Sequence, residues 1–325
     1  MKHYDVFNGD ADGILALLQL RLAEPRDTEL VTGIKRDISL VERVETANLD
    51  KSSMVTVLDI SMEKNASAIK DVLATNASVF YADHHRTGDI PDAENLVANI
   101  DLDANTCTAL IVDKLLDGQF HHWAIAAAYG DNLIQVADEL AQQAGLSNEE
   151  ASGLKELGTL INYNGYGASI HDLAFHPAEL YKALLNYASP FDCLEDVSSP
   201  YHVLKAAFAD DFERAESATV LAESDSCYAV QLEDAAWSRR ISGTYGNHLS
   251  NLAPDRAHVV VTTVDDEHYL ISLRAPLNNK TGAGDICAQF ETGGGRAGAA
   301  GVNRLPKAQL TQFINAVTDY YSNLT

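Results

Sequence analysis

The sequence has few of the features that mark exported, membrane-spanning or zinc-binding proteins. Its 325 residues include four cysteines, and no pair has the Cys-x-x-Cys spacing of a zinc knuckle or a redox motif. No apolar run approaches the roughly 18 residues needed to span a bilayer, and the N-terminus has no signal-peptide core. We therefore expect a cytoplasmic protein with free thiols in a reducing compartment.

Positive charge is also scarce. The chain has 23 Lys and Arg residues against 47 Asp and Glu residues, which gives a formal net charge of −24. Because affinity for nucleic acid comes largely from cations that neutralise phosphates, long DNA or RNA is a poor partner. A short anionic substrate is compatible with this charge if bound metal ions reverse its local sign. Much of the acidity can also serve solubility alone.

The first half of the chain alternates short apolar segments with helical patterns. Strands are predicted at residues 4–8, 29–34, 54–58, 78–81 and 95–99. Helices are predicted at residues 14–22, 38–47, 62–73, 106–116 and 121–129, and residues 147–187 are mostly helical. Nearly continuous apolar strands between helices indicate an α/β fold with a parallel sheet covered on both faces.

The second half has a different pattern. Residues 188–200 have little periodicity and form the best linker candidate, before a predicted helix at 203–221. Strands at 228–232, 257–264 and 269–273, a helix at 244–252 and a final helix at 307–321 indicate a smaller α+β domain. The predicted organisation is a catalytic domain at 1–188, a linker with a connecting helix at 189–224, and a second domain at 225–325.

Acidic side chains recur where the predicted strands of the first domain end. One motif is Asp10-Ala11-Asp12 between Gly9 and Gly13, which let the backbone bend there. The others are Asp59, Asp83 with His84 and His85, and Asp131. Since ligands bind at the carboxyl ends of strands in open α/β sheets, we expect these side chains to converge. The alternative is that each acid only caps the helix that follows it.

Five converging carboxylates cannot all stay ionised in one cleft without cations. Two divalent ions would resolve this, and ligation by carboxylates with one imidazole favours Mn²⁺ or Mg²⁺ over Zn²⁺. Two such ions, roughly 3.5–4 Å apart, suit the hydrolysis of phosphoesters.

A glycine-rich segment in the second domain is the candidate phosphate-binding segment. The glycines at 293, 294, 295, 298 and 301 allow close backbone approach to an anion, and amides ahead of a helix can donate to phosphate. Arg296 adds donors for a phosphate or a guanine edge. Arg274, at a predicted strand end, is the other candidate phosphate contact, with a surface ion pair as its alternative. The substrate-binding candidates are thus Arg274, Gly294, Gly295 and Arg296.

The order of these motifs resembles the DHH phosphoesterase family, and Ser272-Leu273-Arg274 with the glycine-rich segment resembles its DHHA1 domain. The resemblance implies two domains with an active-site cleft between them and manganese-dependent hydrolysis of phosphorylated nucleotides or short oligonucleotides. It implies metal ligation by Asp10, Asp12, Asp59, His84 and Asp131, with Asp59 bridging two ions.

The resemblance also assigns two catalytic residues: Asp83 would orient His84, and His85 would lie close to the scissile phosphate. Two positions depart from the family pattern. Val6 stands where many members carry a histidine, so that Asn8 could supply an amide oxygen nearby, and Arg296 stands where members carry a histidine.

The resulting hypothesis is a two-metal phosphodiesterase that converts very short oligoribonucleotides, with diribonucleotides such as pGpG preferred, to mononucleotides. The alternatives are a phosphatase acting on pAp-type nucleotides, an exopolyphosphatase, and a nucleotide-sensing protein with a degenerate metal site. We expect a nucleotide or short oligoribonucleotide as partner and neither long nucleic acid nor a membrane, and we leave a homodimer open.

Overall fold

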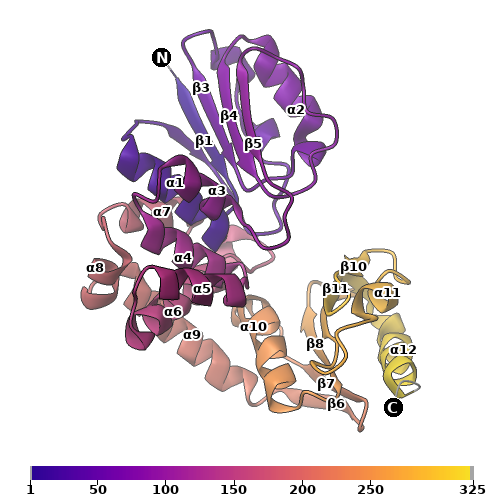
Figure 1. The fold of residues 1–325 in the computed structure, drawn as a ribbon. Helices are drawn as coiled ribbons and strands as arrows, with labels where there is room; N and C mark the ends of the chain where they lie inside the picture. The colour runs from indigo at the N-terminus through magenta and orange to yellow at the C-terminus, as the bar shows by residue number, and fades with distance from the viewer. Residues whose placement is uncertain (1, 323–325) are drawn as a thin grey trace. The chain divides into compact units, whose positions relative to one another are not determined.

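The computed structural model describes residues 2–322, which form two compact units divided between residues 206 and 207 (Figure 1). The first contains a parallel sheet and the second a mostly antiparallel one. This is the predicted α/β architecture with a second, smaller α+β part. No helix in the described part of the chain is both long and apolar enough to cross a bilayer.

The first sheet has five parallel strands in the order β2-β1-β3-β4-β5. The strands are β1 (His3–Phe7), β2 (Glu29–Val31), β3 (Met54–Leu58), β4 (Ser78–Asp83) and β5 (Leu96–Ile100). Because all five run the same way, the residues that follow them lie along one edge. The predicted strands are confirmed, although β2 ends three residues earlier than expected.

Helices cover both faces of this sheet. The helices of the first unit are α1 (Ala11–Ala23), α2 (Met62–Ala74), α3 (Thr108–Leu115), α4 (His121–Gly130), α5 (Ile134–Gln143), α6 (Asn148–Asn164), α7 (Pro177–Leu184) and α8 (Pro190–Glu195). Of these, α1, α2 and α3 contact the sheet, and the others pack mainly on α1, on α3 and on one another. Val6 and Val57 share an apolar core with Ile69 and Val72 of α2. On the other face, Arg21 of α1 donates to both carboxylate oxygens of Asp5, at 2.8 and 2.5 Å. Because successive side chains of β1 point to opposite faces of the sheet, Val6 packs towards α2 and Asp5 towards α1.

The helix predicted at 38–47 is wrong. The segment contains two short 3₁₀ turns, Val41–Arg43 and Thr46–Asn48. Its apolar side chains Leu40, Val41 and Val44 do enter the core, as their spacing suggested. The side chain of Asn65 on α2 satisfies backbone groups of this segment in place of a helix, because it accepts from Val41 N and donates to Ile38 O.

The second sheet has six strands in the order β10-β11-β9-β8-β7-β6. They are β6 (Thr219–Glu223), β7 (Cys227–Gln231), β8 (Ala257–Thr263), β9 (His268–Arg274), β10 (Gly293–Gly295) and β11 (Ala299–Pro306), and only β7 and β8 pair in parallel. The helices are α9 (Pro200–Ala215), α10 (Ala236–Leu252), α11 (Ala283–Cys287) and α12 (Leu310–Ser322). Every residue of β8 is buried, since β8 contacts both α10 and α12.

The segment between the predicted domains is more ordered than its sequence suggested. Residues 188–200 include helix α8, with Pro190 in its first turn, and Pro200 starts α9. Proline fits the first turn of a helix because the missing N–H has no partner there. The predicted connecting helix ends at Ala215, and β6 joins the second sheet. The predicted boundaries 1–188, 189–224 and 225–325 stay a prediction.

Candidate metal centre

Asp10 caps the first helix. Its Oδ1 accepts from the backbone N–H groups of Asp12 and Gly13, at 3.1 and 3.2 Å. The predicted acidic turn at 9–13 is therefore mostly the first turn of α1. The flanking glycines provide space, since a Cβ at Gly9 would overlap the carbonyl of Gly33 and one at Gly13 would overlap that of Asn8. Neither has a positive φ.

Asp12 joins two helices. From the first turn of α1, its carboxylate accepts from Thr108 N and Ala109 N, both at 2.7 Å, at the start of α3. Its side chain is almost fully buried. Backbone N–H groups at a helix N-terminus stabilise a negative charge, so this carboxylate is compatible with burial.

Asp59 follows β3 in an unusual backbone conformation. Its φ of 57° lies in the left-handed region, which is uncommon outside glycine and recurs at functional sites. Its backbone N–H donates to Ala82 O at 3.1 Å, and its Oδ1 lies 3.4 Å from the Thr108 hydroxyl. Burial, together with the charges of Asp12 and Asp10, raises the pKa of Asp59 well above its usual range. A cation here would remove that penalty.

The two histidines of the Asp-His-His motif face Asp59. His84 Nε2 lies 3.5 Å from Asp59 Oδ1 and 3.7 Å from Asp12 Oδ2. His85 Nδ1 lies 2.8 Å from Asp83 Oδ1 and 3.7 Å from Asp59 Oδ1. The imidazole that Asp83 contacts is thus His85 and not His84, and the role of Asp83 stays a prediction. Burial lowers the pKa of His85, but the hydrogen bond to Asp83 outweighs it and the net shift is upward.

Asp131 comes from a helix end and not from a strand end. It is the C-cap of α4, and its Oδ1 lies 3.9 Å from the ammonium of Lys35. The expectation that it follows a strand is wrong. Burial, opposed by Lys35 and supported by Asp12 and Asp10, raises the pKa of Asp131 to about 6.

Lys35 is the member of this cluster that the sequence analysis missed. Its Nζ donates to Asp10 Oδ2 at 2.5 Å and to Asn162 Oδ1 at 3.0 Å. Burial favours neutral Asp10, but the Lys35 ammonium outweighs it and holds the pKa of Asp10 at about 2. Lys35 lies in irregular chain after β2 and 127 positions from Asn162, so no local pattern marked it.

Val6, which stands where many family members carry a histidine, and the nearby Asn8 are both buried. Val6 lies inside β1 and belongs to the apolar core. Asn8 donates from Nδ2 to Lys35 O at 3.2 Å, and its Oδ1 has no hydrogen-bond partner among the described residues. The amide therefore fixes the backbone that carries Lys35.

The cluster has two halves. The lysine half comprises Lys35, Asp10, Asp131 and Asn162, and the imidazole half comprises Asp12, Asp59, Asp83, His84 and His85. Asp59, His84 and His85 each offer a ligand atom within 4.8 Å of the others. Asp83 Oδ2 is buried and has no partner among the described atoms. Carboxylate oxygen and imidazole nitrogen suit Mn²⁺, so the imidazole half fits a divalent ion.

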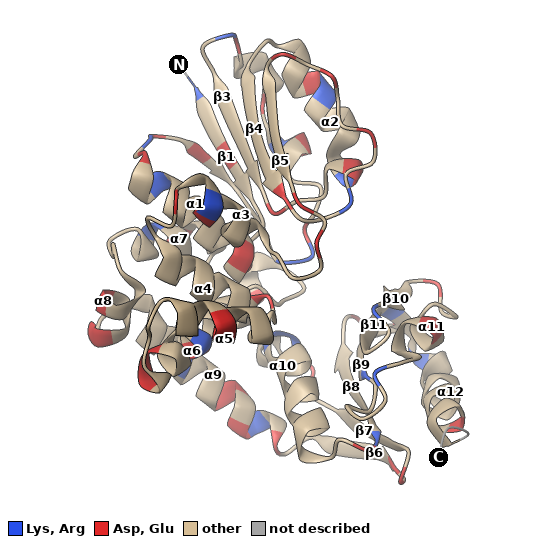
Figure 2. Cartoon of the chain, in the orientation of Figure 1, with Lys and Arg blue, Asp and Glu red and all other residues tan. Residues whose placement is uncertain are grey.

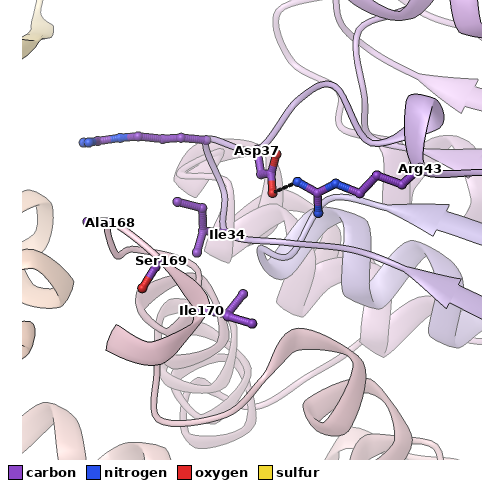
Figure 3. Close-up of a pocket in the computed structure, with 7 residues that line it drawn as sticks. Ile34, Asp37, Arg43, Ala168, Ser169 and Ile170 are labelled. Atoms are coloured by element: carbon purple, nitrogen blue, oxygen red, sulfur yellow. Dashed lines mark hydrogen bonds and ion pairs between the residues drawn. The ribbon is translucent and has the colours of Figure 1, made fainter.

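A pocket of the first unit is lined by the two neighbours of Lys35 in the chain, Ile34 and Arg36, among others. It has a volume of about 470 Å³ and is lined by the loop that carries Lys35 and by residues 168–170 (Figure 3). Asp37 and Arg43 form an ion pair at 2.5 Å on its wall, while Ile34 and Ile170 add apolar surface.

In the second unit, the glycine-rich segment is a hairpin. Gly293, Gly294 and Gly295 form β10 and pair with residues 300–302 of β11. The expectation of amides ahead of a helix is therefore wrong, because a strand follows the segment. Glycine is needed at 295, where φ is 141° and a Cβ would crowd Ala300.

Arg274 and Arg296 lie at the same end of the second sheet. Arg274 ends β9 opposite Ala299, whose carbonyl accepts from Arg296 N at 2.9 Å. The guanidinium of Arg274 donates to Asn247 Oδ1, Ser272 Oγ, Leu273 O and Gly243 O at 2.6–3.2 Å. Arg296 is exposed. Both acidic and basic residues are spread over the two units (Figure 2).

No protein-family model and no curated protein matches the chain. Solved structures do match. A DHH-domain structure described as belonging to a family of ribosomal proteins has a TM-score of 0.60 at 12% identity, with 98% of this chain and 86% of that chain covered. The chain has the DHH-domain fold.

Two further structures share it. RecJ from Thermus thermophilus in complex with Mn²⁺ has a TM-score of 0.63 at 16% identity, over 99% of this chain and 52% of that one, so this chain spans about half of RecJ. The pGpG-specific phosphodiesterase PggH from Vibrio cholerae has a TM-score of 0.54 at 12% identity, over 99% of both chains. The DHH-domain fold and its second, smaller domain are thus confirmed, and the roles of individual residues stay predictions.

Proposed function

We propose that the chain is a metal-dependent phosphodiesterase that converts very short oligoribonucleotides, with diribonucleotides such as pGpG preferred, to mononucleotides. One observation supports it above the others: His84 Nε2 lies 3.7 Å from Asp12 Oδ2 and 3.5 Å from Asp59 Oδ1, and the three residues come from separate elements. The neighbour PggH is described as a phosphodiesterase of this substrate, and RecJ was solved with Mn²⁺.

The imidazole half would hold a divalent cation, with Mn²⁺ as first choice and Mg²⁺ as the alternative. When bound, the cation would polarise a phosphoryl oxygen and lower the pKa of a nearby water. Asp12 and Asp59 bring the negative charge that holds the cation, and the main-chain donors of α3 keep Asp12 in position. The chain thus supplies a fixed, dry electrostatic environment.

His85 is the candidate proton donor for the leaving oxygen. Asp83 holds its Nδ1 at 2.8 Å, and this bond raises the pKa of the ring against the effect of burial. About half of the His85 side chain is exposed, whereas that of Asp83 is fully buried. A protonated, accessible imidazole oriented by a buried carboxylate suits general-acid catalysis at neutral pH.

Arg274 and Arg296 are the proposed phosphate contacts. Guanidinium groups bind phosphate through paired, charge-assisted hydrogen bonds. The surrounding negative charge of the chain disfavours long polyanions, which supports a short substrate. We propose an oligoribonucleotide or nucleotide as partner, and no long nucleic acid or membrane.

The rival enzymes are a pAp-type nucleotide phosphatase and an exopolyphosphatase. They differ from the proposed activity in their product, which is inorganic phosphate. A nucleotide-sensing protein would bind pGpG without turnover, and Val6 at the family's histidine position motivates that alternative.

The test is hydrolysis of RNAs of two to seven nucleotides, pAp and polyphosphate with Mn²⁺, with products resolved by length and by phosphate release. We expect mononucleotides from dinucleotides, loss of activity with a chelator, and recovery with Mn²⁺. Phosphate release from pAp or polyphosphate alone would replace the proposal with a rival enzyme, and binding of pGpG without turnover would replace it with the sensor.

Asp59→Asn assigns the activity to the cluster. It removes a carboxylate whose hydrogen bond comes from a side chain, so the fold keeps its main-chain bonds there. Asp12→Ala is a weaker test, because it would leave Thr108 N and Ala109 N without partners. Asp71→Asn, at an exposed position on α2, is the matched control and should retain full activity.

A further inference from the structure

The lysine half of the cluster already contains a cation. Lys35 Nζ lies 2.5 Å from Asp10 Oδ2, 3.0 Å from Asn162 Oδ1 and 3.9 Å from Asp131 Oδ1. These oxygens come from the start of α1, the end of α6 and the end of α4. Oxygens gathered from three elements around one point are what a protein supplies to a divalent ion, and here an ammonium occupies that point.

The lysine is held at its backbone as well as at its tip. Lys35 N donates to Gly165 O at 2.9 Å, and Lys35 O accepts from the buried Asn8 side chain at 3.2 Å. The side chain is 25% exposed. With both ends fixed, the ammonium is a built part of the cluster and not a surface group that has folded over it.

Asp10 has little capacity left for a further cation. Its Oδ1 caps α1 by accepting from Asp12 N and Gly13 N, and its Oδ2 accepts from Lys35. A divalent ion on either oxygen would lie within a few ångströms of the ammonium, where like charges inside a protein repel strongly. Among the described residues, the carboxylates of the imidazole half have histidines and no lysine at ion-pair distance.

We propose that the Lys35 ammonium takes the place of one of the two divalent cations that the carboxylates would otherwise require, so that the chain binds a single divalent ion, in the imidazole half. This inference rests on the proposed metal site and not on the proposed substrate. It corrects the two-ion expectation, since part of the charge that called for a second ion is supplied by the chain.

The experiment measures metal stoichiometry on the full-length protein. Metal-free protein is titrated with Mn²⁺ by equilibrium dialysis, and the Mn²⁺ EPR spectrum is recorded at saturation. We expect about one equivalent per chain and an uncoupled six-line spectrum, because two ions at roughly 3.5–4 Å would couple their spins. Two equivalents with a coupled spectrum would overturn the inference and leave the proposed function standing.

Lys35→Ala and Lys35→Gln should each raise the stoichiometry towards two equivalents and broaden the spectrum, because each removes the ammonium. The glutamine retains a donor for Asp10 and Asn162, which guards against an unfolded alanine variant. Lys51→Ala removes the same charge from an exposed turn before β3, and should stay at one equivalent. One equivalent in both Lys35 variants overturns the inference, and no binding in any protein overturns the proposed metal site with it.

Discussion

The two units treat charge in opposite ways. The first gathers buried carboxylates at the edge of a parallel sheet, whereas the second places two arginines at one end of a mostly antiparallel sheet. Asp12 is held by main-chain N–H donors from another helix, and Arg274 is held by carbonyl and side-chain acceptors around it. Both charges are thus positioned before any ligand arrives, which reduces the cost of ordering a site on binding.

The units differ in how far their charges are compensated. In the first unit the pKa of Asp59 is raised by burial and by its acidic neighbours, so the cluster remains short of positive charge even with Lys35 present. In the second unit the guanidinium of Arg274 donates to Asn247 Oδ1, Ser272 Oγ, Leu273 O and Gly243 O, and these bonds orient the group. The comparison supports the proposed cation site in the first unit and the proposed phosphate contacts in the second.

The largest expected effect is at the candidate metal centre of the first unit. His84→Gln should lower Mn²⁺ affinity and turnover by about two to three orders of magnitude, because it removes the imidazole nearest Asp59 and Asp12. His122→Gln, on α4 against Phe191, is the matched control and should change neither. Calorimetric Mn²⁺ titration and initial rates check this, and an unchanged affinity in His84→Gln would remove His84 from the site.

The described residues of each unit include a buried Arg–Asp pair, and removing the arginine of each compares the two units in stability. Arg21→Met should cost about 3–5 kcal/mol, because Asp5 would be left as an unpaired charge in a fully dry position. Arg240→Met should cost less, since the Arg240 side chain is 16% exposed against 4% for Arg21 and its pair with Asp211 is better screened by water. Urea unfolding followed by circular dichroism measures both, and the reverse order would contradict this prediction.

A smaller effect is expected at the two arginines of the second unit that are the proposed phosphate contacts. Arg274→Ala should raise KM by about tenfold to a hundredfold, as expected for loss of a hydrogen bond between charged groups, and Arg296→Ala by less because it is exposed. Arg304→Ala, which removes an exposed arginine paired with Asp265, is the control. Steady-state kinetics would contradict the assignment if kcat fell while KM stayed constant in both variants.

The smallest expected effect is the pH dependence of the unfolding free energy, to which His121 in the first unit and His258 in the second should contribute in opposite directions. The hydrogen bond to Asp113 outweighs burial and raises the pKa of His121, so its contribution is present below about pH 6.5 and is lost as pH rises through the raised value. Burial lowers the pKa of His258, so its contribution is present above about pH 6.5 and is lost as pH falls below it.

The contribution of His121 should be under about 1 kcal/mol, because solvent screens its partly exposed side chain. Unfolding free energies of the wild type, His121→Gln and His258→Gln, measured from pH 5 to pH 8, separate the two. Slopes of the same sign for both substitutions would contradict the assignment.

The parallel sheet was predictable because β3 and β4 are nearly continuous apolar runs, β1 contributes Tyr4, Val6 and Phe7, and a polar motif follows each strand. The convergence of Asp12, Asp59 and His84 followed from that geometry. Lys35 was not predictable, because its partners lie 25 and 127 positions away and its own segment is irregular. The glycine-rich hairpin was misassigned because glycine signals a turn locally, whereas pairing with β11 decides its structure.

The hydrogen bonds of Asp12 have an evolutionary consequence. This carboxylate accepts hydrogen bonds from the N-terminus of α3 and also faces His84. Descendants of the chain that had lost catalytic activity would therefore still be selected to retain it. The carboxylate of Asp59 is contacted by a hydroxyl, so it has weaker structural reasons to persist, and the left-handed backbone there would also accept Asn or Gly. Among descendants of such a chain, drift at position 59 would therefore be the earlier sign of lost activity.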